Sequence, residues 1–116
     1  MAHQELKENW ELVKKKLSVK FADGDTIDVD SIIYLIGIQE LGQGYKTFTK
    51  DEKLELMHIA ICKILIPFGY YEFTHIDKDG WPHYNLNKEL PFLKAGEQTI
   101  LLKKAIVQYF IDTKFI

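Results

Sequence analysis

The first part of the chain repeats its apolar residues at the spacing of a helix. Between Gln4 and Leu17, the residues Leu6, Trp10, Val13 and Leu17 recur every three or four positions, with glutamates and lysines between them. This pattern predicts an amphipathic helix that buries one stripe and exposes the rest. The run of lysines at 14–16 falls in its last turn, where cations oppose the negative end of the helix dipole. We therefore interpret the run as a solvated helix end.

The next apolar segment predicts a helix from about Val29 to Leu41. Residues 32–38 are almost continuously apolar, so this helix should be buried on more than one side. Gly37 stands in its middle, where a glycine costs roughly 1 kcal/mol relative to alanine. We therefore expect another helix to cross closely at Gly37.

The clearest helix start in the chain is Thr49, which is followed three residues later by Glu52. In this capping-box pattern, each side chain accepts a hydrogen bond from the other residue's backbone N–H. The helix should end before Pro67, because a proline disfavours helical geometry at the preceding residue. Four polar residues follow at spacings of four, three and four, and so share one edge of this helix: Asp51, Glu55, His58 and Cys62.

Beyond Pro67 the pattern changes to that of a β-hairpin. Residues 71–76 and 81–86 flank Asp77-Lys-Asp-Gly80, a strong turn signal. A loop of two or four residues would place Tyr71, Phe73, His75, Tyr84 and Leu86 on one face and Thr74, Ile76, Trp81 and His83 on the other. His75 and His83 would then be separated. Only a three-residue loop with a bulge would bring the two histidines together, and it would split the aromatic face.

The remaining elements complete an α+β fold. Asn87 is expected to cap a short turn through Leu90, where Pro91 interrupts, and a last helix is predicted from about Glu97 to Ile111. The sequence thus predicts a mostly helical protein of about four helices, with one antiparallel β-hairpin between the third and fourth. With 116 residues and no linker-like change of composition, residues 1–116 are expected to form a single compact domain.

Composition and charge narrow the classes of partner. The chain is 47% hydrophobic and 28% charged, which is typical of an ordered globular protein. A net charge of -2 gives no positive field to attract nucleic acid, and the apolar runs are much shorter than the roughly 20 residues that span a bilayer. We therefore expect neither nucleic acid nor a membrane as partner. The single cysteine and the polar amino terminus indicate a cytoplasmic protein without a secretion signal.

The polar edge of the third helix offers two kinds of chemistry. Glu55-Leu-Met-His58 matches the Glu-x-x-His element of di-iron bundles, but the only other match, at 72–75, falls in a strand, where residues three apart point to opposite faces. Cys62 lies one turn from His58, yet its aliphatic neighbours favour an inert thiol with a raised pKa. We predict no catalytic residue, metal or cofactor. A small metal-dependent or thiol enzyme using Glu55, His58 and Cys62 is the alternative.

Aromatic residues gather around the predicted hairpin, and they favour a binding function. They are Tyr70, Tyr71, Phe73, Trp81, Tyr84 and Phe92. Covering the helices accounts for one hairpin face and leaves Ile76, Trp81 and His83 as an apolar patch. We therefore predict a binding or adaptor module that acts through protein–protein contact with a protein partner or by self-association as a homodimer, with Tyr70, Ile76, Trp81 and His83 as binding residues. A second alternative is a small-ligand cleft in which Tyr70, Trp81 and Tyr84 stack on an aromatic compound.

Overall fold

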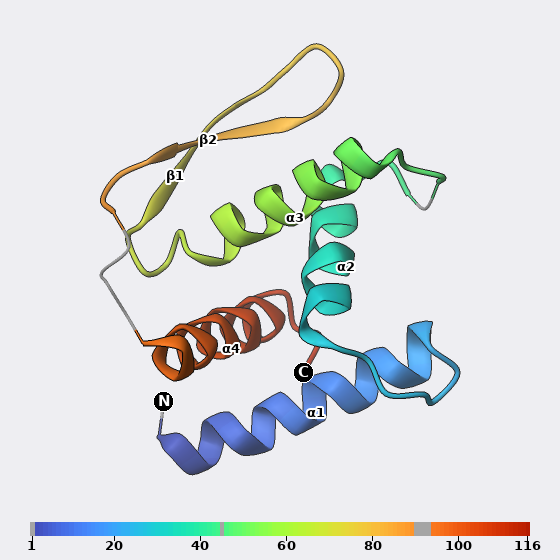
Figure 1. Ribbon diagram of the computed structural model, residues 1–116, viewed down its shortest axis with the longest axis vertical. Coiled ribbons are helices and arrows are strands. Elements are labelled where there is room, and N and C mark those ends of the chain that lie inside the picture. Colours follow the sequence, from blue (N-terminus) through green and yellow to red (C-terminus); the bar gives the residue numbers. More distant parts are fainter. Residues whose placement is uncertain (1, 45, 90–93) are drawn as a thin grey trace. The chain divides into compact units, whose positions relative to one another are not determined.

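The computed structural model describes residues 2–44, 46–89 and 94–116. Within these residues the chain forms four α-helices and one antiparallel hairpin, which confirms the predicted fold class (Figure 1). The elements are α1 (His3–Phe21), α2 (Val29–Leu41), α3 (Lys50–Ile64), β1 (Tyr71–Ile76), β2 (Pro82–Leu86) and α4 (Ala95–Asp112). Leu90, Pro91 and Phe92 lie outside the described residues, and with them the end of the turn predicted after Asn87.

The chain divides into two compact units, one formed by Met1–Asp28 with Pro91–Ile116 and the other by Val29–Leu90. The prediction of a single domain over residues 1–116 stays a prediction. In the first unit α1 contacts α4, and the Lys103 ammonium lies 5.4 Å from the centre of the Trp10 ring. The Lys16 ammonium donates a hydrogen bond of 3.1 Å to the Phe115 carbonyl. All four apolar residues of the predicted α1 stripe are buried.

The second unit is built on a close crossing of α2 and α3. A Cβ added at Gly37 would lie 2.2 Å from the Leu56 carbonyl oxygen and 3.0 Å from the Leu56 Cβ. The two helices approach so closely that only a glycine fits without movement of the α3 backbone. The crossing expected at Gly37 is therefore confirmed, and α3 supplies the partner helix.

The capping box at the start of α3 is confirmed. The Thr49 N–H donates to Glu52 Oε1 over 2.9 Å, and the Glu52 N–H donates to Thr49 Oγ1 over 3.1 Å. The bond from the Thr49 amide is the main cause that lowers the pKa of the Glu52 carboxyl below its usual value. This cap determines where α3 begins, and so it sets the position of the polar edge that follows.

The hairpin adopts the register that the sequence analysis set aside. Hydrogen bonds join the Asp77 N–H to the Trp81 carbonyl and the Gly80 N–H to the Asp77 carbonyl, so the loop is Lys78-Asp79-Gly80. Gly80 has φ +87°, the left-handed conformation that closes a three-residue loop. The predicted separation of His75 from His83 is therefore wrong, because these residues pair directly.

A second irregularity, between Phe73 and His75, keeps the aromatic face intact. Tyr71 pairs with Leu86 and Phe73 with Tyr84, as expected, while Thr74 is the extra residue of a bulge. Beyond the bulge Ile76 pairs with Pro82, which lies on the same face as Tyr84 and Leu86. Ile76 thus belongs to the aromatic face, and its predicted place on the opposite face is wrong.

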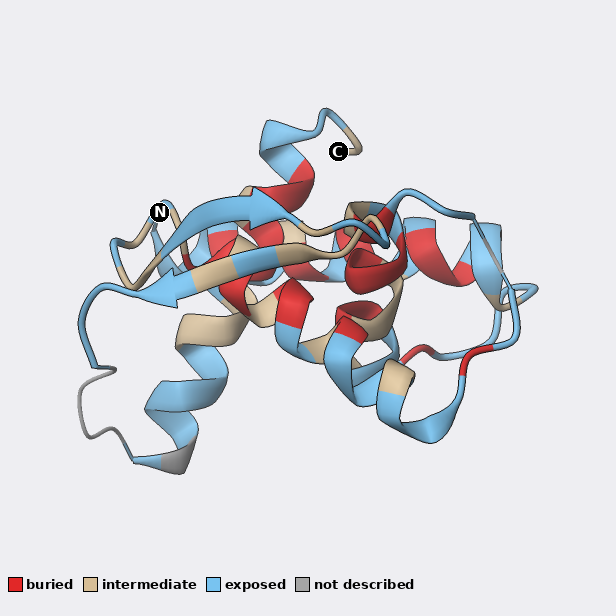
Figure 2. Ribbon diagram, turned by 90° about the horizontal axis from the view of Figure 1, so that it is seen from above, coloured by how far each residue is buried: buried red, intermediate tan, exposed pale blue. Residues whose placement is uncertain are grey.

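The hairpin covers α3 incompletely. Both strands contact α3, yet their residues are exposed or only intermediate in burial, whereas the buried residues of this unit lie mainly on α2 and α3 (Figure 2). Three apolar residues of the aromatic face remain more than half exposed: Phe73 at 51%, Leu86 at 53% and Ile76 at 61%. None of the helices in the described ranges combines the length and the apolar character needed to cross a membrane.

Candidate binding cleft between α3 and β2

A cleft of about 610 Å³ opens between α3 and the start of β2, entirely within the second unit. Its size is that of a typical ligand pocket. We refer to it as the α3–β2 cleft and define it by its lining residues: Asp51, Glu52, Glu55, His58, Ile59, Asp77, Trp81, Pro82, His83 and Tyr84. Carboxylates and imidazoles therefore share this cleft with aromatic side chains.

The α3 wall carries the polar edge that the sequence predicted. Asp51, Glu55 and His58 are exposed and line the cleft, because the cap at Thr49 and the helical repeat align them. Cys62 belongs to the same edge but is fully buried, and its Sγ lies 3.5 Å from His58 Nε2. The edge thus passes from solvent into the core between His58 and Cys62.

The opposite wall begins with an ordered turn built around Asp77. One carboxylate oxygen, Oδ1, accepts hydrogen bonds from the Asp79 and Trp81 amides at 2.9 Å and 3.0 Å. The other oxygen, Oδ2, lies 2.8 Å from His83 Nε2. The hydrogen bond from His83 is the main cause that lowers the pKa of Asp77, followed by the bond from the Trp81 amide. Asp77 therefore fixes both the turn and the direction of the His83 ring.

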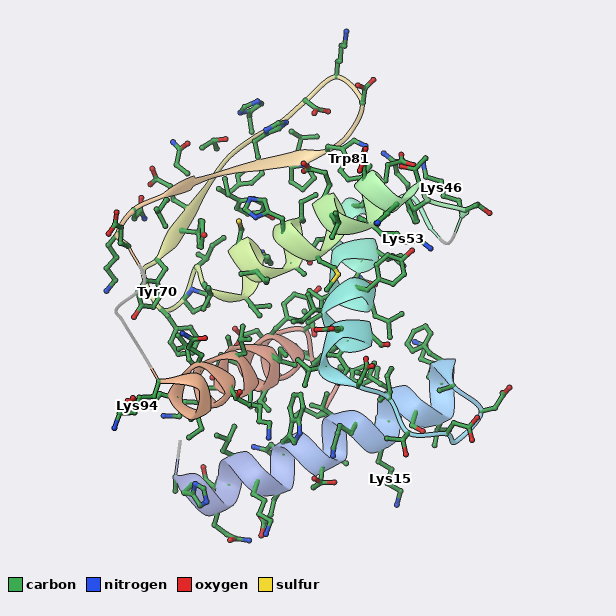
Figure 3. All side chains as sticks on the ribbon, viewed as in Figure 1. Lys15, Lys46, Lys53, Tyr70, Trp81 and Lys94 are labelled. Carbon is green, nitrogen blue, oxygen red and sulfur yellow. The ribbon has the colours of Figure 1, made fainter. Side chains whose placement is uncertain are left out.

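Trp81 and Tyr84 form the aromatic part of the cleft. Trp81 is partly buried and packs against the core cluster of Ile38, Leu41, Phe48 and Leu56. Figure 3 shows Trp81 where the chain returns from the hairpin turn over α3. Burial raises the pKa of the Tyr84 hydroxyl to about 12, with a further contribution from Glu40. Both rings are thus anchored on the core side and present their remaining surface to the cleft.

The two hairpin histidines are held side by side. The His75 and His83 rings are stacked, with centres 4.7 Å apart and planes within 2°. The Thr74 hydroxyl donates to the His83 carbonyl over 3.0 Å and lies 2.9 Å from His75 Nδ1. Because this hydroxyl has a single proton, His75 Nδ1–H is the donor in the second bond. The bulge residue Thr74 therefore orients the His75 ring and is tied to the backbone of His83.

The structure separates the four predicted binding residues. Trp81 and His83 line the cleft, whereas Ile76 and Tyr70 are not among its lining residues. Tyr70 lies at the open end of the hairpin, where its carbonyl accepts from the Asn87 N–H and its ring lies 4.7 Å from the Lys88 ammonium (Figure 3). Tyr70 is therefore not part of the cleft that Trp81 and Tyr84 line.

Sequence reasoning treated the α3 edge and the hairpin aromatics as unrelated groups, and the structure brings them together. Asp51, Glu55 and His58 face the same cleft as Trp81, His83 and Tyr84. The helical repeat identified the first group and the strand pattern the second. No local signal showed that the two groups would face each other, because that depends on how the hairpin packs on α3.

The enzyme alternative depends on the surroundings of Cys62, Glu55 and His58. Burial raises the pKa of the Cys62 thiol to about 11, which favours the protonated and less nucleophilic form at neutral pH. Across the described part of the chain, no three histidine, cysteine, aspartate or glutamate side chains are grouped so that they could hold a metal ion. Glu55 and His58 instead present their polar atoms to an open cleft.

Comparisons with models of protein families, with curated proteins and with solved structures give no match.

Proposed function

We propose that the protein is a binding module that acts through contact with another protein, using the hairpin side of the second unit. The single observation that carries this proposal is the group formed by Phe73, Ile76 and Leu86. These residues lie on one hairpin face by their pairing, and each is more than half exposed. Single exposed apolar residues are ordinary, but several on one face mark a contact surface.

This exposed group is continuous with the α3–β2 cleft. The Phe73 ring contacts the Tyr84 ring edge-on, with centres 5.9 Å apart, and Tyr84 lines the cleft. Pro82, which pairs with Ile76, lines it as well. An apolar group beside a polar cleft matches the anatomy of protein interfaces, in which a desolvated centre is bordered by polar groups. We refer to Phe73, Ile76 and Leu86 as the hairpin surface.

Photo-crosslinking inside the cells that express this protein tests the proposal. A p-benzoylphenylalanine residue placed at Ile76 is expected to give a discrete protein adduct, whereas the same group at Val19, which is 68% exposed on α1, is expected to give none. Mass spectrometry of the adduct distinguishes a second copy of this chain from a different protein. The identified partner, produced separately, should bind the wild-type protein and lose binding to the Phe73→Ser/Leu86→Ser variant.

Two outcomes would count against the proposal. One is the absence of any discrete adduct at Ile76. The other is an identical set of products at Ile76 and Val19, which would mean that both positions report only random encounters.

A further inference from the structure

The α3–β2 cleft contains carboxylates that the rest of the described chain does not neutralise. Among its four acidic residues, Glu52 is engaged in the capping box and Asp77 in the hairpin turn. Asp51 and Glu55, one helical turn apart, have no hydrogen-bond or ion-pair partner within the described residues. Two adjacent carboxylates thus remain available to a cation that enters the cleft.

The opposite wall adds the means to recognise a flat cation. Trp81 and Tyr84 line the cleft across from the α3 edge, and aromatic faces attract cations, tryptophan most strongly. A guanidinium group suits both walls, because it can bond carboxylates in a bidentate manner while stacking on an aromatic ring. An ammonium group is a compact, strongly hydrated point charge and uses the aromatic wall less well.

The chain itself cannot supply this group. All 15 of its basic residues are lysines, and no lysine is among the residues that line the cleft. Lys46 lies near enough to influence Glu52, but its ammonium donates a hydrogen bond of 2.8 Å to Gln43 Oε1. An arginine in the cleft would therefore come from outside these 116 residues, and a second copy of them cannot supply it.

We propose that the α3–β2 cleft binds an arginine side chain from a basic segment of the partner protein. In this arrangement Asp51 and Glu55 accept hydrogen bonds from the guanidinium, and Trp81 stacks on its face. The hairpin surface beside the cleft contacts the apolar residues next to that arginine. The inference rests on the proposed function and specifies the chemistry of the partner.

Peptide binding to the full-length, 15N-labelled protein tests this assignment. The probe is Ac-Gly-Arg-Gly-Arg-Gly-NH2, and its comparison is the same peptide with citrulline, which keeps the shape of arginine and removes its charge. We expect the arginine peptide to shift the Trp81 indole N–H and the backbone N–H signals of residues 51–58, 77–81 and 83–84. The citrulline peptide should leave them unmoved. A lysine peptide should bind several-fold more weakly than the arginine peptide.

Two variants of equal charge distinguish specific binding of the guanidinium by Asp51 and Glu55 from non-specific attraction of a basic peptide to an acidic protein. Asp51→Asn/Glu55→Gln is expected to weaken binding of the arginine peptide by about tenfold or more, since both charge-assisted acceptors are lost. Glu5→Gln/Glu8→Gln removes the same charge from exposed positions on α1 and should leave the affinity unchanged. Equal weakening by both variants, equal binding of the citrulline or lysine peptide, or shifts outside the cleft alone would each overturn the assignment.

Failure of this inference is distinguishable from failure of the proposed function. If the Ile76 position crosslinks to a reconstituted partner while the arginine peptide leaves the cleft unshifted, the module binds protein by other chemistry. If the Ile76 position gives no adduct, the proposed function fails whatever the peptide does.

Discussion

The chemistry of single residues in this protein depends on their burial and on their hydrogen-bond partners. His58 and Cys62 are one helical turn apart, but the first is exposed and the second is fully buried. Asp77 is intermediate in burial and has a lowered pKa, because hydrogen bonds from His83 and two amides favour its charged form. The reactivity of each of these side chains is thus set by its surroundings as well as by its residue type.

Cys62 is expected to react slowly with thiol reagents. With a pKa of about 11 instead of its ordinary value of 9.0, its thiolate fraction at pH 8 falls by roughly 100-fold, and burial restricts access further. Labelling with iodoacetamide should therefore be at least that much slower than labelling of an exposed thiol introduced by Val19→Cys in a Cys62→Ala background. Urea should remove the difference. Fast labelling of Cys62 in the folded protein would show that the thiol is accessible and would reopen the thiol-enzyme alternative.

The Asp77 turn is expected to lose strength in acid. The folded state lowers the pKa of this carboxyl, so its contribution to stability is present above the unfolded value of about 3.9 and is lost as pH falls through the folded pKa. Carboxyl-carbon NMR titration should give an Asp77 pKa below 3.9. His83→Gln should move it back toward that value, since the largest cause of the shift is removed. An Asp77 pKa that is the same in both proteins would contradict this account.

At the scale of elements, the second unit depends on two local geometries. The α2–α3 crossing requires a residue without a side chain at Gly37. The hairpin requires Gly80 in its left-handed conformation and an extra residue at Thr74. The helical pattern and the glycine were sufficient to predict the crossing. The sequence left the bulge as an alternative to the even-numbered loop, because the strand pattern and the turn residues together did not decide between the two registers.

Gly37→Ala is expected to destabilise the protein. The new Cβ would lie 2.2 Å from a backbone oxygen of α3, which cannot move without shifting the helix. We expect a loss of about 1–3 kcal/mol in the free energy of unfolding, even though alanine is the better helix former. Urea denaturation measures the change.

Gly96→Ala provides the matched control in α4, where an added Cβ would meet no atom within 4 Å. This substitution should leave stability unchanged or raise it by up to roughly 1 kcal/mol. Equal effects of the two substitutions would show that the α2–α3 crossing is looser than the structure indicates.

At the scale of the whole molecule, the apolar residues fall into two groups that differ in exposure. The core of the second unit includes fully buried residues such as Leu56 and Ile32, whereas the hairpin surface is more than half exposed. A residue that serves a partner contributes little to the stability of the isolated chain. The stability of variants therefore bears directly on the proposed function.

The Phe73→Ser/Leu86→Ser variant is expected to remain folded, with a total loss of about 1–2 kcal/mol for the two substitutions, because each side chain is already about half in water. Leu56→Ala, at a fully buried position, should cost about 2–5 kcal/mol. Thermal or urea unfolding of both variants makes the comparison. A loss in the double variant as large as that in Leu56→Ala would mean that Phe73 and Leu86 serve the packing of the hairpin, and the binding proposal would lose its main support.

The sequence by itself determined the order and type of the elements, the cap at Thr49 and the crossing at Gly37. These features depend on short-range spacing, which the helical and strand periods display directly. Only the tertiary structure decided that His75 pairs with His83, and that Asp51 and Glu55 face Trp81 across a cleft. Strand register and the placement of a hairpin on a helix follow from the packing of many residues at once, so no single segment of the chain encodes them.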